Sequence, residues 1–140
     1  MKRTTILFAV SLILIFSFPI LPQETAELNS SQMEACYETL QQGLNSDNYG
    51  LKAGCAFMAG EIRCQRSVVC LLKILHNNPS DELRILAALS LYKIGDARGI
   101  YAIKRAIKYD ESKRVQRMCE IFYKAYIQES PNSTINVAVN

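Results

Sequence analysis

The five cysteines have the widest chemistry of any residues in this chain, because a thiolate can attack, bind a metal or form a disulfide. They are Cys36, Cys55, Cys64, Cys70 and Cys119. No Cys-x-x-Cys pair is present, and Cys64 and Cys70 are separated by five residues, whereas zinc sites use two to four. No motif that lowers a thiol pKa is present either. The odd count leaves at least one thiol free or paired with another chain.

His76 is the only histidine, so any histidine-based mechanism depends on one residue. It lies beside Asn77 near the expected end of a helix, where a partly charged imidazole suits the helix dipole. No Ser-His-Asp or Cys-His arrangement can be argued from the spacing of the residues. We therefore expect a protein that is not an enzyme, with no catalytic residue, no cofactor and no metal.

The elements that position these residues follow from an apolar pattern that recurs every 32 residues. The equivalent sets are Leu51, Leu83 and Val115; Cys55, Ala87 and Cys119; Ala59, Leu91 and Tyr123; Val68 and Ile100; Leu71 and Ile103; and Leu75 and Ile107. Self-similarity at this period marks a stack of supersecondary units, each burying its apolar face against its neighbours. The pattern predicts an all-α fold of six helices in three pairs.

The six helices are expected over residues 31–44, 49–62, 66–76, 80–94, from Asp96 onward, and from 110 to 128. Asn78 is expected to cap the fourth helix, with Pro79 at its first position. Gly95 fits a left-handed C-cap, and Asp96 fits the N-cap of the next helix. The fourth helix is apolar nearly all round, so we expect it to be buried on several sides.

The N-terminus has the pattern of an export signal, since Lys2 and Arg3 precede an almost uncharged apolar run over residues 4–21. We predict a signal peptide or an N-terminal anchor at 1–23, a linker at 24–30, the repeat domain at 31–128 and a flexible tail at 129–140. The protein is then expected in the periplasm or cell envelope, with membrane contact only through an uncleaved N-terminal segment.

The charge of the chain gives little pull toward nucleic acid. The formal net charge is +3, and removal of Lys2 and Arg3 leaves a nearly neutral protein. Acidic residues gather at the front, and basic residues gather between Lys104 and Lys124, where we interpret them as solvated helix surfaces. We expect no nucleic-acid partner.

The cysteines can be placed on this framework. Cys55 and Cys119 share their repeat position with Ala87, which indicates small buried core residues. Cys64 stands at a turn between helices and is expected to be exposed. Cys36, Cys64 and Cys70 belong to adjoining helices of the first two units, and we expect one disulfide among them in an oxidising compartment. The alternative hypothesis is a thiol-based redox or metal-handling protein that uses the same three residues.

Residues 80–126 resemble short HEAT-like repeats, the type also found in phycobilisome lyase subunits. The resemblance rests on Leu83-Arg84, on Ala87-Ala88 and on the LYKIGDAR segment at 91–98, and it extends over about 47–127. It implies a right-handed helical solenoid whose second helices line a concave, protein-binding side, and it implies no activity. A subunit of a bilin (chromophore) lyase is a further alternative, suggested only by analogy of fold.

Together these observations predict an exported, non-enzymatic scaffold that binds another protein. The candidate partner-binding residues project from the second helix of each pair, away from the stripe that packs on the first helices. They are Phe57, Arg84, Tyr92, Arg117 and Lys124. A partner with an acidic surface would suit Arg117 and Lys124.

Overall fold

The computed structural model describes residues 30–129, which form six α-helices and one short 3-10 helix, with no strand in that range. The helices are α2 (Ser30–Asn45), α3 (Tyr49–Glu61), η1 (Gln65–Ser67), α4 (Val68–Asn77), α5 (Asp81–Ile94), α6 (Ala97–Tyr109) and α7 (Lys113–Glu129). The predicted all-α class is confirmed. The predicted signal or anchor, the linker up to residue 29 and the tail from residue 130 lie outside the described residues. Among residues 30–129, no helix has the length and apolar character needed to cross a membrane.

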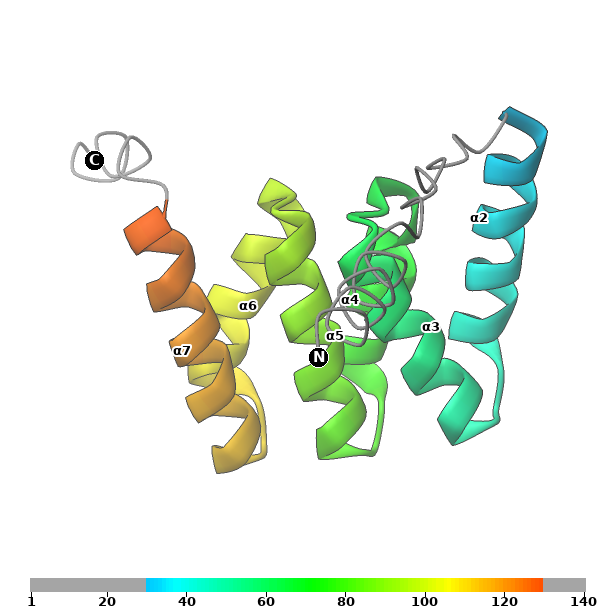
Figure 1. The fold of residues 1–140 in the computed structure, drawn as a ribbon. Coiled ribbons are helices and arrows are strands. Elements are labelled where there is room, and N and C mark those ends of the chain that lie inside the picture. Colours follow the sequence, from blue (N-terminus) through cyan, green and yellow to red (C-terminus); the bar gives the residue numbers. More distant parts are fainter. Residues whose placement is uncertain (1–29, 130–140) are drawn as a thin grey trace, which may run out of the picture.

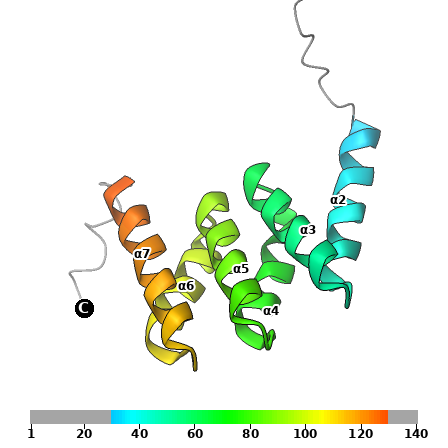
Figure 2. The same ribbon diagram turned by 60° about the horizontal axis from the view of Figure 1, so that its bottom comes forward.

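The helices form three pairs that stack side by side in two layers (Figure 1 and Figure 2). The first layer contains α2, α4 and α6, and the second contains α3, α5 and α7. The second helices begin at Tyr49, Asp81 and Lys113, so successive starts are 32 residues apart. Helix α5 contacts α3, α4, α6 and α7, and this central position makes it the hub of a short helical solenoid.

Side-chain and glycine caps set the helix boundaries. The Asn48 Oδ1 atom accepts from the Leu51 N–H at 3.0 Å, and Asp96 Oδ1 accepts from the Arg98 N–H at 2.9 Å. Gly95 ends α5 with a φ of 73°, in the left-handed region that favours glycine. The predicted roles of Gly95 and Asp96 are confirmed.

The predicted N-cap at Asn78 is wrong. Ser80 caps α5, and its Oγ accepts from the Leu83 N–H at 3.3 Å. Asn78 instead ends α4 in an extended conformation, and its Oδ1 accepts from the Ser80 N–H at 3.0 Å. The Asn78 side chain accepts from the N–H two residues on and so closes a turn of its own, and the helix begins only after Ser80. The N-cap of α5 therefore lies two residues later than predicted.

The core runs along the plane between the two layers. Its fully buried members include Val68 and Leu71 from α4, Leu91 from α5, Ile103 from α6 and Val115 from α7. In α5 the buried set also contains Ala87, Ala88 and Ser90, which lie on more than one side of the helix. The prediction that this helix is buried on several sides is confirmed, and small residues let its neighbours approach closely.

Candidate functional site

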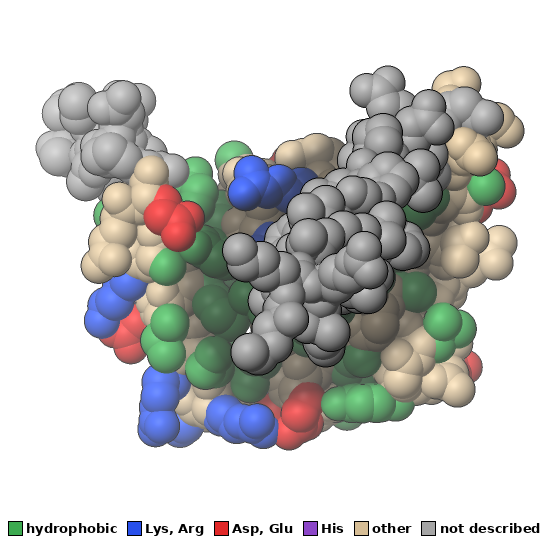
Figure 3. Space-filling model, in the orientation of Figure 1, with side chains coloured by type: hydrophobic (Ala, Val, Ile, Leu, Met, Phe, Trp, Pro, Cys, Tyr) green, Lys and Arg blue, Asp and Glu red, His purple; other side chains and the backbone are tan. Residues whose placement is uncertain are grey.

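The second helices carry a row of apolar side chains at matching positions. Phe57 on α3 and Ile121 on α7 are 45% and 51% exposed, and Leu89, half-buried on α5, lies between them at the equivalent position. One helical turn earlier in each helix is Gly54, Leu86 or Met118, on the same face because residues three apart are neighbours. We call these six residues the apolar row: Gly54, Phe57, Leu86, Leu89, Met118 and Ile121. Hydrophobic side chains are also seen to gather along this side of α7 in Figure 3.

Ion pairs between neighbouring second helices flank the apolar row, one pair about one helical turn before it and one about one turn after it. Glu82 on α5 pairs with Arg114 on α7 at 2.5 Å, and Glu61 on α3 pairs with Lys93 on α5. The Lys93 Nζ also lies 5.2 Å from the centroid of the Phe57 ring. Exposed pairs of this kind contribute at most about 1 kcal/mol each. Their main effect is to surround an apolar strip with charge, which is the anatomy of a protein-binding patch.

Tyr92 and Phe57 differ in how available they are to a partner. The half-buried Tyr92 ring stacks on Phe122 with 6.0 Å between centroids, and its hydroxyl donates to Glu129 Oε1 at 2.7 Å. This hydrogen bond to a carboxylate raises the pKa of Tyr92. Tyr92 therefore joins α5 to α7, whereas Phe57 is exposed within the apolar row.

Arg84 is not a surface residue, and its predicted role in partner binding is wrong. Its side chain is 3% exposed. The guanidinium donates to both carboxylate oxygens of Asp110 at 3.1 Å, to Asp81 Oδ1 at 2.8 Å and to the Asn78 carbonyl at 2.7 Å. These acceptors come from the turns that enter α5 and α7, so Arg84 ties two repeat units together from inside.

The other two predicted basic residues lie on the surface of α7. Arg117 precedes Ile121 by four residues and Lys124 follows it by three, so both lie one turn from Ile121. Lys124 pairs with Glu120 at 2.7 Å, while Arg117 has no carboxylate partner among residues 30–129. Arg117 is thus the freer of the two cations beside the apolar row.

All five cysteines are free thiols, and no disulfide joins Cys36, Cys64 and Cys70. The expectation of an exposed Cys64 is wrong, since the side chain is buried and its Sγ accepts from the Ser67 hydroxyl at 3.2 Å. The backbone explains this burial, because the Cys64 N–H bonds the Ala59 carbonyl at 2.9 Å and folds the turn against α3. Cys55 and Cys119 are buried, as predicted from their repeat position. Burial raises the pKa of Cys119 to about 12.

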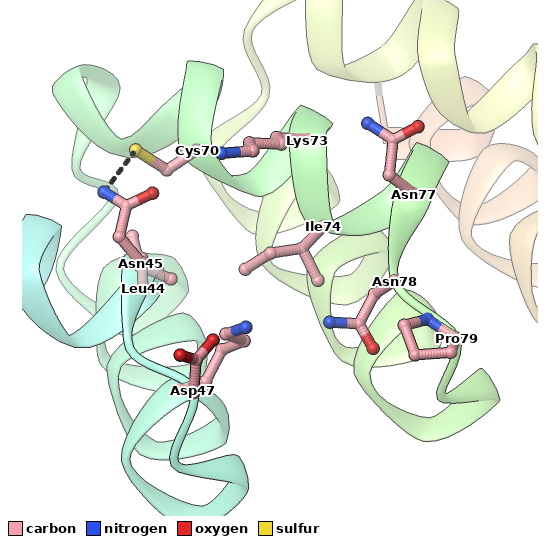
Figure 4. Close-up of a pocket in the computed structure, with 10 residues that line it drawn as sticks. Leu44, Asn45, Asp47, Cys70, Lys73, Ile74, Asn77, Asn78 and Pro79 are labelled. Carbon is pink, nitrogen blue, oxygen red and sulfur yellow. Dashed lines mark hydrogen bonds between the residues drawn. The ribbon is translucent and has the colours of Figure 1, made fainter.

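Cys70 lines a hollow of about 260 Å³ where α2, α3 and α4 meet (Figure 4). The Asn45 amide donates to its Sγ at 3.9 Å, and Lys73 lies one turn further along α4. Asp47 lines the far side of the hollow. Within residues 30–129 no group of three or more His, Cys, Asp or Glu side chains could hold a metal ion.

Thiol accessibility gives a direct prediction. Under native conditions an alkylating reagent should modify the half-buried Cys36 and Cys70 and spare Cys55, Cys64 and Cys119, because the reactive thiolate must be both formed and reached. Intact mass should therefore show two adducts, rising to five in denaturant. Peptide mapping that finds Cys119 modified before unfolding would contradict this burial.

The sequence interpretation missed Leu89 and Ile121, although a signal for both was present. Adding the 32-residue period to Phe57 gives Leu89, and adding it again gives Ile121. The period was applied to buried positions alone, where apolar residues are expected in any repeat. Large apolar residues that recur at a position outside the buried core are the more informative pattern, since an exposed apolar patch marks an interaction surface.

Comparison with known proteins agrees with this architecture. The sequence profile of HEAT repeats matches residues 37–121, which is more than half of the chain and includes the apolar row. No curated protein sequence matches the chain. The paired helices in two layers and the profile match lead to one conclusion: this chain belongs to the HEAT-repeat family.

Proposed function

We propose that this protein is a non-enzymatic scaffold that binds another protein through the apolar row on its second helices. The observation that carries the proposal is the series formed by the exposed Phe57 and Ile121 with the half-buried Leu89 between them, which crosses all three second helices. HEAT repeats generally mediate protein–protein interaction. Burying exposed apolar surface against a partner favours binding by about 25 cal/mol for each Å² removed from water.

Site-directed charge insertion tests the proposal. The double variant Phe57→Glu/Ile121→Glu should reduce recovery of the partner at least tenfold when the full-length chain is used as bait, because two apolar contacts are lost and two carboxylates would have to lose their hydration against an apolar partner surface. Both side chains are about half exposed, so thermal unfolding should remain near that of the native protein.

The matched control is Ile62→Glu, since Ile62 is 44% exposed at the end of α3 and outside the apolar row. Partner recovery with this control should equal that of the native chain. Equal recovery with the double variant would refute the apolar row as the binding surface. The partner is best identified by placing a photo-crosslinking amino acid at position 121.

Two basic residues of α7 beside the apolar row indicate which charge a partner should carry. Arg117 and Lys124 lie on either side of Ile121, so a partner whose apolar patch has an acidic border fits them. Substituting both residues with Glu should slow association at low salt, and added salt should then speed association instead of slowing it, as measured by surface plasmon resonance. A variant that associates at the native rate at both low and high salt would remove the acidic border from the proposal.

The proposed place of action is the cell envelope, and it rests on the sequence of residues 1–23. Lys2 and Arg3 followed by the apolar run at 4–21 are the features that export machinery recognises. The intact mass of the native protein tests it. A chain lacking these residues supports cleavage and export, and a full-length chain recovered from the soluble cell contents contradicts both export and anchoring.

A further inference from the structure

A groove with a different chemistry lies in the other layer, between α4 and α6. It has a volume of about 490 Å³, and its apolar floor is formed by Leu72 from α4 and Ala102 from α6. Arg98, Tyr101 and Arg105 line the α6 side. They are three and four residues apart, so they follow one face of the helix.

The two helices that form this groove contain no acidic residue. They carry five cations, namely Lys73 on α4 and Arg98, Lys104, Arg105 and Lys108 on α6. Arg98 pairs with Asp96 at 2.9 Å, but none of the other four has a carboxylate within ion-pair distance among residues 30–129. Of these cations only Arg98 and Arg105 line the groove, so Arg105 is the lining cation whose charge no carboxylate of the described residues neutralises.

The acidic groups around the groove are engaged elsewhere or on Arg98, with which Asp96 pairs at 2.9 Å. Asp110 and Glu111, at the end of α6, both face the guanidinium of Arg84, at 3.1 and 3.5 Å. On the α4 side the His76 Nδ1–H donates to the Leu72 carbonyl at 2.8 Å, which fixes the orientation of the imidazole at the wall of the groove. A ligand thus meets Arg105 without competition from a carboxylate of the chain.

An aromatic side chain stands beside these cations. Tyr101 is 64% exposed, and none of the described ring stacking or cation–π contacts involves it. A large exposed aromatic next to arginine is typical of binding surfaces, where both residue types are enriched. The apolar floor, the aromatic wall and the free Arg105 guanidinium together fit a ligand with both an apolar and an anionic part.

We infer that this groove binds an acidic segment of a partner protein, with one large apolar side chain on the floor and a carboxylate on Arg105. The inference rests on the proposed scaffold function and adds a second surface to it. Side chains two positions apart lie on the same side of an extended peptide. We expect a motif in which an acidic residue stands two positions from a Leu, Ile, Phe or Met.

A random 12-residue peptide display library is the probe. Peptides selected on the full-length chain should be enriched in this motif, and fluorescein-labelled copies allow affinity to be measured by anisotropy. Arg105→Glu should weaken binding at least tenfold, because a favourable charge contact becomes a repulsive one. Lys108→Glu is the matched control, since it makes the same charge change on the same helix outside the groove, and it should change affinity less than about threefold.

Several results would overturn the inference. These are a library that yields no acidic motif, selected peptides that Arg105→Glu leaves unaffected, and equal losses for Arg105→Glu and Lys108→Glu. Vesicles of phosphatidylcholine and phosphatidylglycerol form a second arm. Binding to them that depends on Arg105, without binding to acidic peptides, would replace the peptide by an anionic lipid surface.

The groove and the apolar row can fail separately. Peptides that bind the groove should bind the Phe57→Glu/Ile121→Glu variant with unchanged affinity, since the two surfaces lie in different layers. Loss of peptide binding in that variant would contradict the groove. The Arg105→Glu variant could still capture the partner while the double variant does not. That result would support the apolar row and would show that the groove is not needed for the scaffold function.

Discussion

Replacing Arg84 by methionine is expected to lower the free energy of unfolding by about 3–5 kcal/mol, the cost of removing one partner of a buried ion pair. Asp110 makes two hydrogen bonds to the guanidinium, and its side chain is 7% exposed. Methionine fills much of the same volume but leaves this carboxylate buried without a counterion. The Asn78 carbonyl also loses its 2.7 Å donor. Urea denaturation of the two proteins measures the difference.

The control for Arg84 is another arginine with a carboxylate in a neighbouring repeat. Arg114 pairs with Glu82, and the two side chains are 63% and 53% exposed. Arg114→Met should therefore cost no more than about 1 kcal/mol. Similar losses in the two variants would show that solvent reaches Arg84. Asp110→Asn provides a second test, because the amide keeps one acceptor for Arg84 and should cost less than Arg84→Met.

The helical framework was predictable from the sequence because its determinants are local. Gly95 and Asp96 stand next to each other, and each meets a requirement of the backbone that no distant residue can change. The burial of α5 followed in the same way, since an apolar helix in the middle of a stack has neighbours on most sides. The shift of the α5 N-cap from Asn78 to Ser80 is the size of error expected where two capping residues compete.

The site was less predictable because it depends on contacts between repeats. In the sequence, Arg84 looks like a surface cation. Its burial depends on Asp110, which comes from the turn before α7 and accepts hydrogen bonds from the guanidinium. Cys64 likewise depends on how its turn folds against α3. The groove between α4 and α6 combines residues about 30 positions apart, so its charge is visible in the sequence but its shape is not. Periodicity identifies equivalent positions, whereas burial within a repeat depends on its neighbours.

Gly60→Ala is expected to destabilise the protein by at least about 1 kcal/mol, although alanine is normally the better helix former by about the same amount. A Cβ at position 60 would lie 2.9 Å from the Ser90 Cα and 3.0 Å from its Cβ and Oγ. These are backbone and short side-chain atoms of a buried residue in α5, so they cannot move aside. Overpacking of this kind costs about 1–3 kcal/mol. Moving Ser90 would also lengthen the 2.7 Å hydrogen bond that its hydroxyl donates to the Ala56 carbonyl.

Gly54→Ala makes the same chemical change in the same helix and should have the opposite sign. A Cβ at position 54 meets nothing within 4 Å. The free energy of unfolding of this variant should therefore rise by about 0.5–1 kcal/mol, because alanine lowers the backbone entropy of the unfolded state. Urea denaturation of the pair thus separates helix propensity from the packing of α3 on α5. Two stabilised variants would mean that the second helices can move apart at Ser90 without loss. Opposite signs would show that this close approach holds α3 and α5, and with them the apolar row, in one fixed arrangement.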